Sequence, residues 1–388
     1  MAKSKRIRNF LFQGHRYLGL VLGIIIAIAG LTASMMIVML DTEEFFIRQG
    51  IEEVVPQGER LSLEVLSDRA KDAPIAQGYS TVTSISPYTF PNRPLDSPVT
   101  VSLSKPNNED DWIDVILNPY TGKVLGQAPE RNVYETVLNL HYTLLAGKAG
   151  GIMMGVTGLL GFILMVTGIA LWSGWRKLAT GFKIKWKGHL KRRNFGIHQV
   201  AGIFSGIFLS LALFTGFIYN FPDFTYPLIY QLTFSPVPPE EFVSTPIAGK
   251  SSITLTAALD AIKREIPEGI FTQIDIPQTA TDVYQVRKKV PGDWYGNPTW
   301  GRSFAQVDRY SGKVLSAIDI TKASLGEKIA NGMDIFHFGL FGEIFGRILY
   351  FCVGLSPTIL LMTGFTMYRL RRRHPKLQTQ GDRSLIKH

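Results

Sequence analysis

Four long stretches without a charged residue constrain the fold of this chain more than any other feature. A helix needs about 20 apolar residues to cross the roughly 30 Å hydrocarbon core of a bilayer. Stretches of that length or longer, each free of Asp, Glu, Lys and Arg, occur at 17–40, 149–172, 199–221 and 348–368. The sequence therefore predicts an α-helical membrane protein with four transmembrane helices.

The composition agrees with a membrane protein and excludes several kinds of site. Charged residues make up 19% of the 388 residues and hydrophobic residues 46%, whereas soluble domains are about 25% charged. The single cysteine, Cys352, excludes a disulfide scaffold. It also excludes zinc and iron–sulfur sites built from several cysteines.

The basic residues gather on one side of the predicted spans. Segments 1–16, 173–198 and 369–388 together hold 20 Lys and Arg and one acidic residue, Asp382. Because basic residues near the span ends mark the cytoplasmic side, both termini and the 173–198 loop are expected there. This topology accounts for the net charge of +10, so binding to nucleic acid is not expected.

The order of segments follows from these spans. The two long segments on the outer side are expected to fold as α+β modules, each with a helix followed by antiparallel strands. In chain order the segments are a cytoplasmic N-terminus 1–16, TM1 17–40, module 1 41–148, TM2 149–172, a basic cytoplasmic loop 173–198, TM3 199–221, module 2 222–347, TM4 348–368 and a cytoplasmic tail 369–388.

The chain contains an internal repeat. The sequence NPYTGKVLGQ at 118–127 matches DRYSGKVLSA at 308–317. Gly122 and Gly312 occupy the same place in this motif, where a tight turn needs a positive φ. Two histidines of each half also correspond, so three landmarks recur in the same order at offsets of 183, 190 and 196 residues. Because each unit has two spans, the sequence predicts two repeats in the same orientation, related by a pseudo-two-fold axis along the membrane normal.

Four of the seven histidines occupy these equivalent places. His15 and His198 stand at the cytoplasmic ends of TM1 and TM3, and His141 and His337 stand just before TM2 and TM4 on the outer side. Neutral imidazole is a strong ligand of haem iron, and two imidazoles fill both axial positions. The placement points to two haems, each held by two histidines. The remaining histidines lie in basic stretches and are expected to be solvated: His189, His374 and His388.

Glycines accompany the first two of these histidines. The spacing H-x-x-x-G-x-x-x-G begins at His15 and again at His198. Glycine on a histidine's face would let a flat macrocycle approach the backbone, although small residues four apart also serve ordinary helix packing. A lone histidine at a membrane interface is commonly structural, and zinc would want a third and a fourth ligand. Because residues four apart stack, the glycines on these faces are Gly19, Gly23, Gly202 and Gly206.

With these landmarks the chain resembles the PepSY-associated transmembrane proteins, a bacterial inner-membrane family. The resemblance rests on the His-x-x-x-Gly entries to TM1 and TM3, the NPYTGKVLG and DRYSGKVLS turns, and the histidines before TM2 and TM4. It extends from about Arg8 to Arg373. The family includes di-haem reductases of ferric siderophores. The resemblance implies two b-type haems, whose axial ligands would be His15, His198, His141 and His337.

The resemblance also implies an activity. Electrons would cross the inner membrane and reduce the iron of a ferric siderophore or another ferric chelate on the periplasmic side, which aids iron release and uptake. No catalytic acid, base or nucleophile is expected, because adding one electron needs none. The chain has no G-x-G-x-x-G or flavodoxin-like segment, so the electron donor is expected to be a separate flavoprotein or a membrane quinol.

Two features of the outer side leave alternatives open. A single straight helix over 140–172 would place His141 roughly 45 Å from the cytoplasmic level, unless glycines break it at Gly147, Gly150 and Gly151. The loop at 292–304 contains aromatic residues that could stack on a chelate, lie at lipid headgroups or cap strands. They are Trp294, Tyr295 and Trp300.

Two other functions fit part of the pattern. A non-enzymatic PepSY membrane protein could bind or regulate a periplasmic partner such as a peptidase, and it would be colourless and would not need the histidines. A permease component for iron or its chelate would transport without reduction. The spans contain no lysine or paired acids, which argues against a proton-coupled transporter.

Overall fold

The computed structural model describes residues 2–90, 94–106, 108–129, 132–238, 242–293, 301–342 and 344–373. Trp294, Tyr295 and Trp300 of the predicted loop, and His374 and His388 of the tail, lie outside this part of the chain. The chain forms two compact units. The helical unit comprises Met1–Met39, Asn132–Thr225 and Phe336–His388, and the sheet unit comprises Leu40–Arg131 and Tyr226–Ile335.

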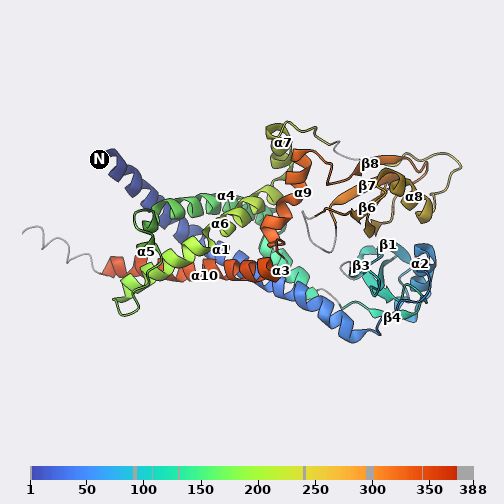
Figure 1. Cartoon of the computed structure of the whole chain (residues 1–388), viewed down its shortest axis with the longest axis horizontal. Helices are drawn as coiled ribbons and strands as arrows, with labels where there is room; N and C mark the ends of the chain where they lie inside the picture. The colour runs from blue at the N-terminus through green and yellow to red at the C-terminus, as the bar shows by residue number, and fades with distance from the viewer. Residues whose placement is uncertain are drawn as a thin grey trace, which may run out of the picture. The chain divides into compact units, whose positions relative to one another are not determined.

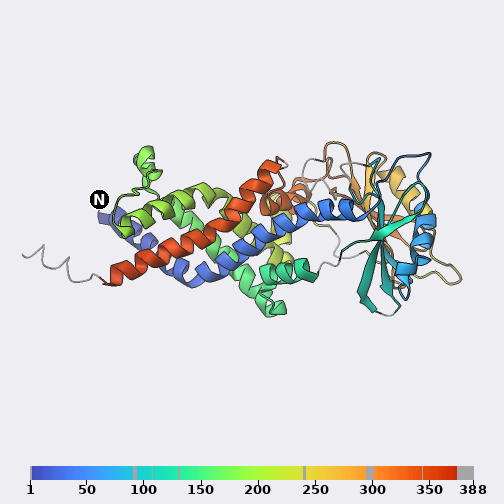
Figure 2. The same ribbon diagram turned by 90° about the horizontal axis from the view of Figure 1, so that it is seen from below.

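Four long helices make up most of the helical unit (Figure 1). Figure 2 shows them running side by side within this unit. Among the described residues they are the helices long and apolar enough to cross a membrane, and they contain the predicted uncharged stretches to within one residue. The chain is therefore a multi-pass membrane protein. The helices are α1 (Ala2–Gly50), α4 (Gly147–Leu171), α6 (Leu190–Asn220) and α10 (Ile344–Arg373).

Small residues set the distance between α1 and α10. A methyl group added at Gly30 would overlap the carbonyl oxygen of Gly354, so the two backbones meet there. Across the same contact, Ser34 Oγ donates to the carbonyl oxygen of Phe351 at 2.9 Å. Some of the glycines in the spans thus serve helix packing, as is common in membranes.

Pro357 lies inside α10 and cannot donate a backbone hydrogen bond. The carbonyl of Val353, four residues earlier, accepts instead from Ser356 Oγ at 2.7 Å. An unpaired carbonyl in hydrocarbon would be costly. The serine beside the proline therefore lets the helix continue through it.

A short helix precedes each of α4 and α10, and a turn separates it from the span. α3 (Asn132–Thr143) is followed by Leu144 and Leu145, whose φ angles are 52° and 58°. α9 (Leu325–Phe338) is followed by Gly339, whose φ is 68°. The segment 140–172 is therefore two helices and not one straight helix, and the break precedes the glycines from which it was expected.

The basic loop between α4 and α6 contains the 3₁₀ turn η2 (Ser173–Trp175) and the short helix α5 (Leu178–Gly181). Ser173 Oγ donates to Gln199 Oε1 at 2.7 Å, and Gln199 Nε2 donates to the carbonyl of Gly181 at 2.8 Å. The loop is thereby fastened to α6 one residue after His198. A further helix, α7 (Pro222–Leu232), follows α6.

The sheet unit contains an eight-stranded antiparallel sheet in the order β4-β3-β2-β1-β5-β6-β7-β8. β1 pairs with β5, with Ser84 opposite Asp275 and Ile85 opposite Ile274. The two predicted α+β modules thus join edge to edge in one sheet. The strands are β1 (Thr81–Ser86), β2 (Val99–Lys105), β3 (Asn108–Leu117), β4 (Val124–Gln127), β5 (Ile270–Asp275), β6 (Val283–Lys289), β7 (Ser303–Asp308) and β8 (Val314–Ile318).

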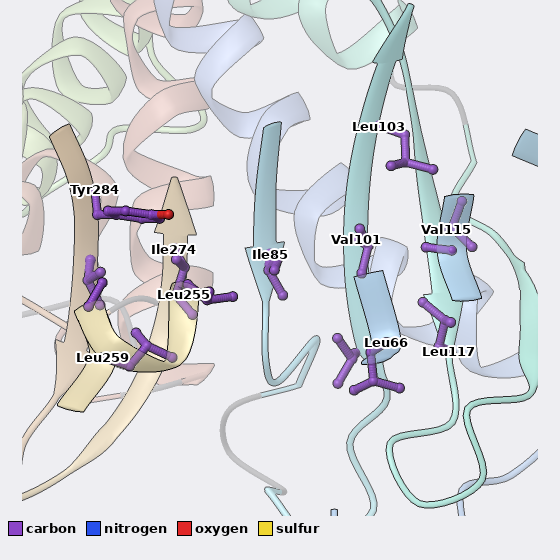
Figure 3. Close-up of a cluster of buried hydrophobic side chains, with 14 of the residues drawn as sticks. Leu66, Ile85, Val101, Leu103, Val115, Leu117, Leu255, Leu259, Ile274 and Tyr284 are labelled. Carbon is purple, nitrogen blue, oxygen red and sulfur yellow. The ribbon is translucent and has the colours of Figure 1, made fainter. Parts of the chain in front are cut away.

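Two helices, α2 (Leu63–Lys71) and α8 (Leu255–Glu265), pack against alternate residues of these strands, and the 3₁₀ turn η1 (Pro74–Ala76) follows α2. Each helix begins at a side-chain cap, because the hydroxyls of Ser62 and Thr254 accept from backbone N–H groups three residues on. Successive side chains of a strand face opposite sides of the sheet, so every second one joins the core. Figure 3 shows this core, which includes Leu66, Leu255, Leu259, Ile85, Val101, Val115 and Ile274.

The two matched sequence motifs form the same turn, at the ends of β3 and β7. Asn118 Oδ1 accepts from the backbone N–H groups two and three residues on, and Asp308 Oδ1 does the same. Gly122 and Gly312 have φ angles of 67° and 72°. The predicted positive φ at both glycines is confirmed.

Hydrogen bonds keep the carboxylate of Asp308 ionised. Burial raises its pKa, but hydrogen bonds from Ser311, Thr245 and Tyr310 outweigh burial and lower the pKa to about 2. An unfolded aspartate has a pKa of about 3.9. The ionised group therefore stabilises the fold above about pH 4, and this contribution is lost as the pH falls through about 2.

Replacing Asp308 by Ala is expected to lower the free energy of unfolding of the sheet unit by about 2 kcal/mol at neutral pH, because backbone N–H groups lose their acceptor. Asp308→Asn should cost less, since Asn118 supports the equivalent turn with a neutral amide. Denaturant unfolding of the purified protein measures both. The difference in free energy of unfolding between the natural protein and Asp308→Asn should decrease as the pH falls from about 4 toward about 2. A difference that stays constant over this range would contradict the role of the charge.

Candidate functional site

The structure brings His15 and His198 together. His15 lies on α1 and His198 on α6, and their ring centroids are 6.2 Å apart with the ring planes at 88°. Both residues belong to the helical unit. This pair is called the inner pair below.

The structure also brings His141 and His337 together, at a second level of the helical unit. Their ring centroids are 6.2 Å apart and their planes make an angle of 75°. This outer pair is carried by the short helices α3 and α9. The separation of the rings is the same in both pairs, although the helices that present them differ.

In the inner pair, Nδ1 of each histidine is held by a neighbouring span. His15 Nδ1 lies 3.0 Å from the carbonyl oxygen of Leu164 and 3.3 Å from Thr167 Oγ1, both on α4. His198 Nδ1 lies 2.9 Å from Thr363 Oγ1 on α10. Each ring is thus oriented by the helix beside its own.

The outer pair is held in the same way. His141 Nδ1 lies 2.9 Å from the carbonyl oxygen of Ala29 and 3.0 Å from Thr32 Oγ1, both on α1. His337 Nδ1 lies 2.9 Å from Thr215 Oγ1 on α6. Although they precede the spans α4 and α10, the outer histidines are therefore fastened to α1 and α6.

The carbonyl contacts show that Nδ1 carries the proton in His15 and His141, because a carbonyl oxygen can only accept. Each threonine hydroxyl has one hydrogen, and it donates that hydrogen to a carbonyl of its own helix at 2.7–2.8 Å. With that hydrogen assigned to the carbonyl, the threonine oxygen accepts, and the same Nδ1 donor role is assigned to His198 and His337. This is the arrangement of a metal-ligating histidine, whose second nitrogen donates to a fixed acceptor.

The spacing of the rings fits two axial ligands of one haem iron. A histidine nitrogen lies about 2 Å from a first-row metal and about 1.1 Å from its ring centre, so two imidazoles on opposite sides of a metal have centres about 6 Å apart. An edge-to-face ring contact falls in the same range. In all four rings the nitrogen engaged by a neighbouring helix is the same one, Nδ1.

The donor set does not suit zinc. Among the described residues, no group of three or more His, Cys, Asp or Glu side chains is placed to hold a metal ion. Structural zinc takes four such ligands. Bis-histidine haem needs only two, because the macrocycle supplies the other four nitrogens.

The four orienting threonines were not among the residues singled out from the sequence. Thr32 and Thr215 differ by 183 positions, as the inner histidines do, and Thr167 and Thr363 differ by 196, as the outer histidines do. The available signal was a Thr-Gly dipeptide in three spans, at 167–168, 215–216 and 363–364, and a further Thr-Gly at 157–158 has no such histidine. It is inconspicuous because both residues are common in membrane helices.

In each of the three dipeptides beside a histidine, the glycine leaves space for the imidazole ring. A methyl group added at Gly168 would lie 2.8 Å from His15 Cε1, and one at Gly364 would lie 3.5 Å from His198 Cε1. At Gly216 the distance to His337 Cε1 would be 3.6 Å. The threonine therefore holds the imidazole while the next residue leaves it room.

The four glycines that were predicted to face a macrocycle have flexible side chains as their nearest neighbours. A methyl group added at Gly19 or Gly202 would meet only the ends of leucine side chains, at 3.8 Å and 3.6 Å. At Gly23 it would lie 2.8 Å from Leu361 Cδ1, and at Gly206 it would lie 3.2 Å from Ile169. No backbone of another helix approaches these positions, in contrast to Gly30. Their surroundings can therefore yield to a flat ligand.

The two levels are closer than a straight helix would allow. His15 and Thr32, which binds His141, are 17 residues apart on α1, or about 25 Å at the helical rise. His198 and Thr215 have the same separation on α6. The separation of roughly 45 Å that a straight helix over 140–172 would give does not apply, because that segment breaks after Thr143.

A glycine permits this break in each half. A methyl group added at Gly150 would overlap the carbonyl oxygen of Thr143 at the end of α3, and one at Gly346 would overlap that of Phe341. These glycines are 196 residues apart, as the outer histidines are. The close approach allows α3 to leave α4 steeply and to bring His141 against α1.

A family model described as PepSY-associated TM region matches residues 12–371. The match covers nearly the whole chain and includes all four histidines and all four threonines. No curated protein matches the chain significantly.

Replacing Gly150 by Ala is expected to destabilise the helical unit, because the added methyl group has no room beside the carbonyl of Thr143. The neighbouring Gly151→Ala is the matched control, since its methyl group would lie 3.4 Å from Asn220 Oδ1. Thermal melting of both purified variants compares them. Gly150→Ala should lower the free energy of unfolding by about 2–3 kcal/mol and the melting temperature by several degrees. Equal melting temperatures of the two variants would contradict the close approach.

Proposed function

The chain belongs to the PepSY-associated TM family, and from this premise we propose that it is a transmembrane electron-transfer protein that reduces a ferric chelate. Two b-type haems would carry the electrons, one on His15 and His198 and the other on His141 and His337. The observation that carries the proposal is the shared state of the four imidazoles. Nδ1 of all four is engaged by a neighbouring span, and the four rings form two pairs at the spacing of axial ligands.

The proposal includes a duplicated architecture. In each unit the two halves would be related by a two-fold axis, which in the helical unit would run along the membrane normal. The equal offsets of histidines, threonines and turn glycines support this arrangement. So does the strand order, in which β1 and β5 pair at the centre and β4 and β8 lie at the edges.

The orientation is proposed from the charges. The basic loop and both termini would be cytoplasmic, in the inner membrane of a bacterium, because they hold twenty of the basic residues. The inner pair then lies on the side of an electron donor such as a flavoprotein or a quinol. The outer pair lies on the periplasmic side, where it would pass electrons to the chelate.

A bis-histidine haem has no open coordination position, so what it supplies when bound is one-electron transfer. The protein's part is to hold the two levels apart and keep them dry. The levels lie about 25 Å apart along α1, which spans most of the roughly 30 Å hydrocarbon core. Between the levels, Leu22 and Ile26 pack against Leu164 in an apolar cluster.

Reduction of the substrate needs no protein nucleophile or acid. The ferric iron of the chelate gains one electron and becomes ferrous, and the donor on the other side loses one. Ferrous iron is held weakly by chelators built for ferric iron, so it is released. This accounts for a site made of imidazoles and apolar side chains without a catalytic triad.

Replacing His337 by Ala is expected to remove one haem and abolish chelate reduction, because the outer pair loses a ligand. The inner haem should remain, so haem content should fall from two to one per chain. His189→Ala is the control, since His189 is an exposed histidine at the start of α6. Haem content and absorption spectra before and after dithionite measure the outcome, with ferric-chelate reduction in proteoliposomes.

The result also separates the alternatives. A purified natural protein without haem would favour a PepSY protein that binds a partner such as a peptidase. Uptake of a chelate without its reduction would favour a permease component. A fully active His337→Ala protein would show that the outer histidine is structural.

The topology can be tested by labelling from one side. Cys352, which is exposed in α10, is first replaced by Ser. Single cysteines at Asn108, in β3, and Thr180, in α5, should then react from opposite sides of the membrane. Labelling of both from the same side would overturn the proposed orientation.

A further inference from the structure

Arg16 is a charged side chain without a charged partner among the described residues, at the level of the inner pair. It follows His15 on α1 and is half-buried. Its Nε is shielded from solvent and makes no hydrogen bond within the described part of the chain. The ring of Tyr17 lies close, with Arg16 Cζ 4.5 Å from its centroid.

The equivalent position in the second half is filled differently. Gln199 follows His198, 183 residues after Arg16. Its amide accepts from Ser173 Oγ at 2.7 Å and donates to the carbonyls of Gly181 and Thr180 at 2.8 Å and 3.0 Å. One half thus satisfies this position from within the protein, whereas the other presents a cation with unused donors.

Among the described residues, the segments at this level supply no carboxylate side chain. Segments 1–16 and 173–198 and the four uncharged stretches contain no Asp or Glu, and Asp382 of the tail lies outside the described residues. A shielded guanidinium is stabilised by charge-assisted, bidentate hydrogen bonds to a carboxylate or phosphate. A carboxylate or phosphate of a ligand would supply such a partner for Arg16.

We infer that Arg16 binds a propionate of the haem held by His15 and His198; this inference rests on the proposed haem binding. A b-type haem carries two propionates at one edge of its macrocycle. Neighbouring residues of a helix point about 100° apart, so Arg16 would flank the ring and not face the iron, and its side chain is long enough to reach the edge. Arg16 is a positioning and tuning residue for the inner haem, and it distinguishes the two halves of the repeat.

The electrostatic consequence is measurable. Reduction adds an electron to the haem, and a nearby positive charge favours the reduced form. Arg16→Gln, which copies Gln199, should therefore make the inner haem harder to reduce, about tenfold in equilibrium constant, which is about 59 mV for one electron. Arg16→Lys should keep the midpoint potential of the inner haem close to that of the natural protein, because lysine keeps the positive charge.

The experiment is a redox titration in the His337→Ala background, which isolates the inner haem. Arg8→Gln serves as the matched control, since Arg8 is an exposed basic residue on the same helix. The apoprotein is then reconstituted with haem or with haem whose propionates are methyl esters. If Arg16 binds a propionate, esterification should remove the difference in midpoint between the protein with Arg16 and the Arg16→Gln variant. Arg8→Gln should leave the midpoint unchanged with either haem.

Two results would overturn the inference. One is an unchanged midpoint in Arg16→Gln. The other is a difference in midpoint potential that persists with the esterified haem and depends instead on anionic lipid. Vesicles of phosphatidylcholine with and without phosphatidylglycerol test this dependence. Such a result would assign a lipid phosphate as the partner of Arg16. If Arg16→Gln does not fold, the midpoint potentials of Arg16→Lys and of the natural sequence with the esterified haem still test whether Arg16 binds a propionate. A natural protein that binds no haem would overturn both this inference and the proposed function.

Discussion

Inside a bilayer a polar atom has no water to bind, so its partner must come from the protein or from a ligand. This requirement explains the polar details of the helical unit. Ser356 replaces the hydrogen bond that Pro357 cannot give, and Ser34 bonds across to α10. The four threonines donate to their own helices and contact Nδ1 of the imidazoles. In the proposed function, the haems would supply the further partners of the imidazoles and of Arg16.

Much of the helical unit could be predicted because its strongest signals are local. Uncharged stretches of more than 20 residues indicate spans directly, and the repeat offsets pair the histidines by their spacing in the chain alone. The turn glycines Gly122 and Gly312 were recognisable for the same reason, since a positive φ restricts the residue type. These features depend on a few neighbouring residues.

Other features depend on contacts between distant segments and left weaker marks. Thr167 and Thr363 orient histidines more than 140 residues away, yet a threonine in a span is unremarkable by itself. The break after Thr143 occurs at leucines, which ordinarily favour helix, because Gly150 allows the close approach of α3 and α4. Pairing of β1 with β5 was also unpredictable, because any two strand edges can pair and only the tertiary fold selects among them.

The edge-to-edge joining of the two halves bears on how such a chain could have arisen. A polypeptide of half this length would present the edge of β1 without a neighbouring strand, and such edges invite pairing with another copy. Ile85 and Ile274 face each other across the central strand pair, as identical residues would in a symmetric dimer. Each half also contributes one imidazole to each pair. If the two halves arose by duplication, as proposed, a single-repeat ancestor would have been complete only as a homodimer, and gene fusion would have made that partnership permanent while freeing positions such as 16 and 199 to diverge.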